Sequence, residues 1–261
     1  MSEESLQITV LVDNPRSWYC PYAGQLVEAL RSDHHQVAFL HDSMAIPEGD
    51  CAFLLSCSRL IRPEVLSRNR HNIVVHSSAL PEGRGFAPLS WQILEGRSSI
   101  TNTMFEAASE VDSGVVYATN EMHFEGHELV EELRALQAAK IAELVFMFVA
   151  NYPNLSARPQ VGTPSAYSRR RNVDSRLDVN KTIAEQFDLL RIVDNDSYPA
   201  FFHYRGYRYV LRIHKDGPVS EDLASATHSV NGHAQRDAPE PAQAVKVDKA
   251  EEEVSVELRH K

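Results

Sequence analysis

Short apolar runs alternate with segments of helical periodicity in the first third of the chain. The runs are long enough for buried strands and lie at Ile8–Val12, Val37–Leu40, Cys51–Leu55 and Ile73–Val75. Apolar residues recur at helical spacing over Tyr22–Leu30, and Pro63–Leu66 begins a second, short helix. Strands that alternate with helices in this way predict an α/β fold, a doubly wound and mostly parallel sheet with helices on both faces.

The middle of the chain contains the strongest helix pattern. A helix at Trp91–Leu94 precedes two strands, at Thr101–Phe105 and Val115–Tyr117. From about His127 to Asn151, apolar residues form one stripe and charged residues occupy the other side. Pro153 ends this helix. We expect the stripe to pack in the core and assign it no function.

A smaller C-terminal part follows a linker that contains proline and glycine. Asn180–Ile192 has a helical pattern, and Phe201–Tyr204 and Tyr207–Ile213 flank Arg-Gly as a hairpin. We therefore predict a catalytic domain over residues 1–153 and a helix-and-hairpin appendage over residues 154–216.

The last 45 residues differ in composition from the rest. No aromatic residue occurs after Tyr209, and residues 217–261 contain nine acidic and five basic side chains. Such a segment cannot bury enough apolar surface to offset the entropy lost on ordering. We predict a disordered acidic tail over residues 217–261, with a short helix that folds on a partner as the alternative.

Composition narrows the class of protein. The 261 residues include 36 acidic and 26 basic side chains, a net charge of −10, which disfavours a nucleic-acid partner. The N-terminus lacks a secretory signal, no apolar stretch is long enough to cross a bilayer, and the three cysteines are too few for a disulfide framework. We expect a cytoplasmic protein that binds a small molecule and no membrane. The histidines show no metal-ligand spacing, so no metal is predicted.

The first candidate for chemistry is His76, directly after an apolar strand. A loop with Pro81, Gly83, Gly85 and Pro88 follows it. Ligands of open parallel sheets bind outside the carboxyl ends of the strands, where this histidine is expected. The alternative is a surface histidine that ends a strand.

The second candidate is Asp112, in the loop Glu110–Gly114 between two strands. An Asp beside Gly is typical of a turn. Its carboxylate could also orient His76 or accept a proton.

The third candidate is the run Arg169–Arg171 together with the aromatic hairpin. Arginines beside aromatic rings could bind a diphosphate and stack on a base. A solvated helix start with a core hairpin, or a contact between subunits, are the alternatives.

These motifs, in this order, resemble the folate-dependent formyltransferases. The resemblance rests on His-Ser-Ser-x-Leu-Pro-x-x-Arg-Gly-x-x-Pro-x-x-Trp at 76–91, Gly96, Thr103 and Val-Asp-Ser-Gly at 111–114, and it covers roughly residues 8–150. It implies a Rossmann-like formyltransferase fold and transfer of a formyl group from N10-formyltetrahydrofolate, as co-substrate, to a primary amine.

The resemblance also implies roles for individual residues. His76 stabilises the oxyanion or relays a proton, and Asp112 holds His76 and helps to deprotonate the amine. Arg84 borders the substrate cleft. The pterin pocket corresponds to Arg59, Leu60 and Ile61 and to the loop from Glu106 to Val111.

One position departs from the family pattern. The family has a catalytic Asn two residues before the His, and Val74 stands there in this chain. Asn72, on the same face of the strand, and Asn102, on a neighbouring strand, are the candidates to supply the missing hydrogen-bond donor.

The C-terminal part is similar to that of enzymes that formylate nucleotide-linked amino sugars. This similarity implies that Arg169, Arg170, Arg171 and Phe201 bind the substrate, and that the protein is a homodimer. The expected activity is N-formylation of a 4-amino-4,6-dideoxy sugar in surface glycan (lipopolysaccharide) biosynthesis. The alternatives are an enzyme like methionyl-tRNA or glycinamide ribonucleotide formyltransferase, and a non-catalytic folate-binding relative.

Overall fold

A computed structural model describes residues 5–219, and the chain up to Lys215 forms one compact unit. The predicted acidic tail lies outside the described residues from position 220 onward. No helix in the described part of the chain is long and apolar enough to span a membrane.

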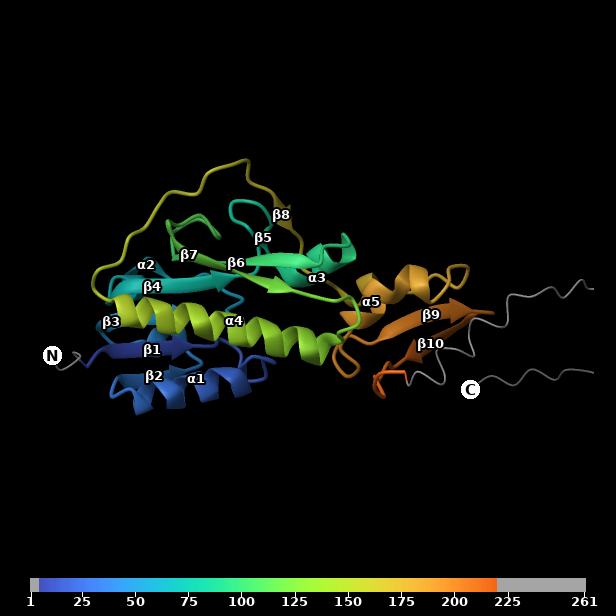
Figure 1. Ribbon diagram of the computed structural model, residues 1–261, viewed down its shortest axis with the longest axis horizontal. Coiled ribbons are helices and arrows are strands. Elements are labelled where there is room, and N and C mark those ends of the chain that lie inside the picture. Colours follow the sequence, from blue (N-terminus) through green and yellow to red (C-terminus); the bar gives the residue numbers. More distant parts are fainter. Residues whose placement is uncertain (1–4, 220–261) are drawn as a thin grey trace, which may run out of the picture. The chain divides into compact units, whose positions relative to one another are not determined.

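The centre of the unit is a six-stranded sheet (Figure 1). Its strands are β1 (Gln7–Leu11), β2 (Gln36–Leu40), β3 (Gly49–Leu54), β4 (Asn69–His76), β6 (Ser99–Glu106) and β7 (Val116–His123). They lie in the order β2-β1-β3-β4-β6-β7. The first four are parallel, whereas β6 is antiparallel to β4 and to β7. The predicted fold class, a mostly parallel sheet with flanking helices, is confirmed.

Two long helices cover one face of the sheet. α1 (Cys20–Ser32) and α4 (Val130–Asn151) share one core cluster with the inward residues Val10 and Phe53. Because side chains alternate along a strand, the neighbouring Leu11 and Leu54 point to the other face. There they pack with α2 (Pro63–Leu66). α3 (Pro88–Leu94) belongs to a separate cluster with β6, β7 and the start of α4.

The reversal of direction at β6 places a loop over the sheet. His76 pairs with Thr103 and Ile73 with Glu106, so β6 ends beside the middle of β4. Residues 107–115 then return along the α2 face of the sheet toward the end of β4, since Ala107 packs there. This path brings a loop residue to the carboxyl end of β4.

The C-terminal part crosses back to the main sheet before it forms its own elements. β8 (Ala166–Tyr167) pairs with β5 (Arg84–Gly85), and β9 (Ala200–Tyr204) pairs with β10 (Tyr207–Leu211) as the predicted hairpin. Three 3-10 turns lie at Ser43–Ala45, Asn172–Ser175 and Ala184–Gln186.

The helix expected over Asn180–Ile192 is shorter than predicted. Only α5 (Phe187–Arg191) is α-helical. The Gln186 amide instead donates to three carbonyls upstream, and Thr182 forms reciprocal hydrogen bonds with Glu185. Side chains that satisfy the backbone in this way stabilise turns at the expense of a helix.

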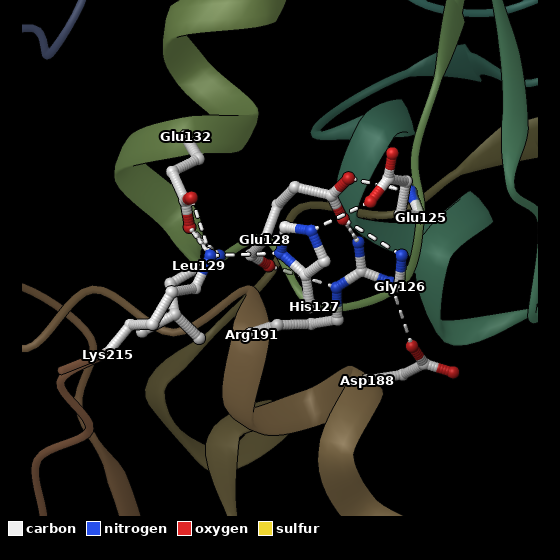
Figure 2. Close-up of polar contacts among 9 residues, drawn as sticks. All are labelled: Glu125, Gly126, His127, Glu128, Leu129, Glu132, Asp188, Arg191 and Lys215. Atoms are coloured by element: carbon white, nitrogen blue, oxygen red, sulfur yellow. Dashed lines mark hydrogen bonds and ion pairs between the residues drawn. The ribbon is translucent and has the colours of Figure 1, made fainter. Parts of the chain in front are cut away.

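Arg191 anchors α5 to the start of α4 (Figure 2). Its buried guanidinium lies 2.6 Å from the Glu128 carboxylate and donates to the Glu128 carbonyl. Nearby, Lys215 pairs with Glu132 and lies 3.0 Å from Nδ1 of His127. These contacts hold the C-terminal part against the domain that carries His76.

Candidate active site

A cavity of about 560 Å³ opens at the carboxyl ends of β1, β3 and β4. This volume lies in the range typical of small-molecule sites. Its walls come from the loops after these strands, from the start of α3, from one side of α4 and from the C-terminal part. His76 and Asp112 both line it.

The imidazole of His76 is held by a backbone carbonyl. Its Nε2 lies 2.8 Å from the Gly83 oxygen, and a carbonyl can only accept a hydrogen bond, so Nε2 carries a proton. Nδ1 faces Asp112 Oδ2 at 3.8 Å, within ion-pair range of a protonated ring but too far for a hydrogen bond. In the neutral ring Nδ1 is therefore a free base, and in the protonated ring it is a donor.

The conformation of the 107–115 loop orients Asp112. Its backbone has φ of 51°, and its Oδ2 accepts a hydrogen bond from the Gly85 N–H at 2.8 Å. The Gln160 amide donates to the carbonyls of Asp112 and Gly114. The Asp112 carboxylate is mostly buried and keeps one oxygen, Oδ1, free of these contacts.

Asp13 fixes the opposite wall. Its Oδ2 accepts hydrogen bonds from the backbone N–H groups of Ser58 and Arg59, which positions the loop that follows β3. Arg59, Leu60 and Ile61 of this loop line the cavity.

The C-terminal part contributes two arginines to the cavity. Arg169 stacks on the Phe86 ring, with 4.3 Å between its guanidinium carbon and the ring centroid. Arg170 is partly buried, and burial lowers its pKa although Asp174 opposes the shift. Its Nε is enclosed and has no partner among the described residues, and its other nitrogens make only long contacts of 3.4–3.5 Å.

The structure brings together many of the residues predicted from the sequence. Those that line the cavity are His76, Asp112, Arg59, Leu60, Ile61, Val111, Arg169 and Arg170. The remaining predicted residues do not line it: most of their side chains have other partners, and Arg171 is exposed.

The two asparagines proposed as substitutes for the family Asn point elsewhere. The Asn72 amide donates to the Leu66 carbonyl at the end of α2. Asn102 is fully buried, accepts from the Ser77 hydroxyl and donates to Asn120. Neither amide reaches the cavity.

Four further predicted residues lie outside the cavity wall. The Glu106 carboxylate turns to the Asn72 N–H and the Tyr117 hydroxyl. Arg84 donates to Gln160, and Arg171 is exposed. Phe201 is buried under Arg208 in the hairpin, with 4.2 Å between the guanidinium carbon and the ring centroid.

Sequence reasoning missed several residues of the wall. They are Arg134, Gln137, Asp194 and Tyr198, and Trp18 also lines the cavity, although its position after the first strand favoured a role in filling the underside of the loop. Arg134 pairs with Asp194 at 2.8 Å and lies 5.5 Å from the centre of the Trp18 ring. Burial raises the pKa of Asp194, but the Ser197 N–H and Arg134 outweigh this effect and lower it. The helix pattern predicted that Arg134 faces outward with the other charged residues, but its side chain is mostly buried and lines the cavity. The available signal was spacing, since Arg134 and Gln137 stand at helical intervals between Val130 and Ile141.

Comparison with known proteins finds a family model that matches nearly half of the chain. Residues 24–146 match the family described as Formyl transferase. The methionyl-tRNA formyltransferase of Sulfurihydrogenibium sp. (strain YO3AOP1) is 23% identical over 146 residues, 54% of this chain and 47% of the relative. The chain thus spans about half the length of the curated relatives it matches.

Solved structures share the fold at low identity. A 4-N formyltransferase from Francisella tularensis matches with a TM-score of 0.60 and 17% identity, over 82% of this chain and 99% of that chain. HypX from Aquifex aeolicus in complex with tetrahydrofolic acid matches with a TM-score of 0.68 and 17% identity, over 80% of this chain and 38% of that chain.

Proposed function

We propose that this chain, whose residues 24–146 match the Formyl transferase family, transfers a formyl group from N10-formyltetrahydrofolate to the amine of a nucleotide-linked amino sugar. The observation that carries this proposal is the pairing of His76 with Asp112 inside a cavity of ligand size. The folate derivative supplies the formyl carbon at which the amine reacts.

The proposed chemistry assigns the two residues different tasks. The attacking amine must lose a proton, and the free Asp112 Oδ1 or the His76 Nδ1 lone pair can accept it. The formyl oxygen gains negative charge as the carbon becomes tetrahedral. Once protonated, His76 Nδ1 is a donor for that oxygen. The oxyanion then re-forms the carbon–oxygen double bond as the bond from carbon to the folate nitrogen breaks, and that nitrogen takes the proton that the base had removed from the amine.

The residues after β3 suit the pterin. Asp13 holds the backbone of Arg59, and Arg59, Leu60 and Ile61 border the cavity. Leu66 and Val74 add apolar surface beside them. Such a wall combines a flat apolar contact with backbone hydrogen-bonding groups, which a pterin ring requires. HypX from Aquifex aeolicus, which shares the fold, was solved in complex with tetrahydrofolic acid, and this supports a folate as the ligand.

The C-terminal wall suits the nucleotide. Arg169 and Arg170 present guanidinium groups to the cavity, and phosphates are bound well by such planar donors. The enclosed Nε of Arg170 lacks a protein partner within residues 5–219, which favours an anionic ligand beside it. A 4-N formyltransferase and a sugar N-formyltransferase among the structural relatives support an amino sugar as the acceptor.

The test is turnover of N10-formyltetrahydrofolate with UDP-, GDP-, CDP- and dTDP-linked 4-amino-4,6-dideoxy sugars. We expect a formylated sugar with at least one of them, and loss of that product in His76→Ala. Absence of product with every amino sugar would reject the proposal. Product with methionyl-tRNA alone would instead assign the activity named for the curated relatives.

A further inference from the structure

Gln137 lies on α4, and its side chain borders the same cavity as His76. Its amide Nε2 lies 2.7 Å from the Ser77 hydroxyl. Neither the Ser77–Gln137 contact nor any role for this glutamine follows from the motifs at 76–91 and 111–114.

A chain of directed hydrogen bonds determines which end of the Gln137 amide faces Ser77. Asn120 donates to the Lys140 carbonyl, which can only accept, so the Asn120 oxygen faces Asn102. Asn102 donates to that oxygen, and its own oxygen accepts from Ser77. The Ser77 hydroxyl has then used its one proton and can only accept from Gln137.

The amide oxygen of Gln137 is therefore directed away from Ser77. Among the described residues it has no hydrogen-bond donor, although its amide group borders the cavity. The chain of bonds leaves α4 at Lys140 and returns to it at Gln137, so the amide cannot rotate without breaking buried hydrogen bonds. The result is a fixed acceptor on the α4 wall, which also presents Arg134 and the apolar side chains of Val130, Leu133 and Ile141.

We propose that Gln137 Oε1 accepts a hydrogen bond from the acceptor amine and orients its lone pair toward the formyl carbon. This inference rests on the proposed formyl transfer. A primary amine has more than one N–H, so one proton can remain bound to Gln137 while another passes to the base. Val74 packs on the α2 face of the sheet and provides no polar group near His76. Gln137 supplies a polar group from α4, on the other face of the sheet, where it contacts Ser77 at the end of β4.

The first test replaces Gln137 by Met, which has similar length and no amide. We expect KM for the amino sugar to rise about tenfold and kcat to fall, while the affinity for 5-formyltetrahydrofolate and the Tm stay unchanged. Gln25→Met is the matched control, because Gln25 is exposed on α1 and does not line the cavity.

A binding measurement distinguishes loss of the contact to the amine from a loss of binding that does not depend on the amine. The nucleotide-linked amino sugar and its 4-deoxy counterpart are titrated calorimetrically into wild type and Gln137→Met. The wild type should bind the amino sugar more tightly than the 4-deoxy sugar, and the ratio of the two Kd values should fall about tenfold in Gln137→Met. Ser77→Ala serves as a second variant: it frees the amide to rotate, and a smaller rise in KM is expected.

The outcomes are distinct. If the wild type forms product and both variants keep its KM and its preference for the amine, Gln137 has no role and the proposed function stands. If the wild type neither forms product nor prefers the amine, the proposed function fails and the inference fails with it.

Discussion

Nδ1 of His76 and Oδ2 of Asp112 lie 3.8 Å apart, although β5, α3 and β6 separate the two residues in the chain. The pair forms because Gly83 holds the far side of the imidazole and Gly85 holds the carboxylate. Both glycines belong to the loop that follows His76. One loop therefore positions the histidine and the aspartate relative to each other.

Asp112→Asn should reduce kcat by about 100-fold or more, because the amide cannot accept the proton of the amine. The amide oxygen can still accept from the Gly85 N–H, so the Tm should change little. Steady-state rates with a productive amino sugar test this expectation. Asp33→Asn, at an exposed position after α1, is the control. Equal rates in Asp112→Asn and wild type would exclude Asp112 as the base.

Arg170→Met should raise KM for the nucleotide-linked sugar at least about tenfold, since loss of a charge-assisted hydrogen bond has this size. Arg171→Met should leave KM near the wild-type value, because Arg171 is exposed and does not line the cavity. Titration with the unmodified nucleoside diphosphate provides the same comparison without turnover. Equal effects of the two substitutions would contradict the assignment of Arg170 to the cavity wall that binds the nucleotide.

Gly114→Ala should lower both the Tm and kcat. A Cβ at this position would lie 1.7 Å from the Glu106 carbonyl oxygen, so the loop that carries Asp112 must move. Gly24→Ala is the matched control on α1, where a Cβ meets no atom within 4 Å. There the smaller backbone entropy loss should stabilise the protein by about 0.5–1 kcal/mol. Thermal unfolding and steady-state activity of the two variants test these expectations.

Glu128→Gln should lower the free energy of unfolding by about 3 kcal/mol, because it leaves the buried Arg191 without its closest counter-charge. Glu28→Gln, in an exposed pair with Arg31, should cost less than about 0.5 kcal/mol. Urea unfolding at neutral pH compares the two. A similar small loss in both variants would show that Arg191 does not anchor α5 through Glu128.

The same carboxylate predicts a pH dependence. Burial raises the pKa of Glu128, but the N–H groups of Glu125 and Gly126 and the Arg191 charge outweigh it and lower the pKa. A lowered pKa in the folded state stabilises the protein above the ordinary pKa of Glu, and this stability is lost as the pH falls through the lowered value. The difference in free energy of unfolding between wild type and Glu128→Gln should therefore become smaller below about pH 4.

The four parallel strands could be predicted because each contains a separate apolar run, whereas β7 is rich in polar residues and was predicted only over Val115–Tyr117. The α5 region could not, since Thr182 and Gln186 bond to the local backbone and override the helical spacing of the apolar residues. The motifs placed His76 and Asp112 at one site, but the direction of other side chains depends on packing. Arg170 and Arg171 are adjacent in an extended segment, so they point to different sides.

Gln137 shows the same limit for a cavity residue that the sequence interpretation did not identify. A polar residue within an apolar stripe was visible in the sequence, but its partner Ser77 lies 60 residues away. Only the chain of hydrogen bonds through Asn102 and Asn120 fixes its orientation. The predicted homodimer, in contrast, stays a prediction, and light scattering tests it.

The two sides of the cavity come from different stretches of the polypeptide. Arg169, Arg170, Asp194 and Tyr198 lie in one continuous segment, whereas the wall assigned to the folate comes from the loops after β3 and β6. Substitutions in that segment can therefore change the wall for the acceptor without altering the wall assigned to the folate. We expect a chimaera with residues 166–213 of a relative to retain folate affinity while adopting the acceptor preference of that relative.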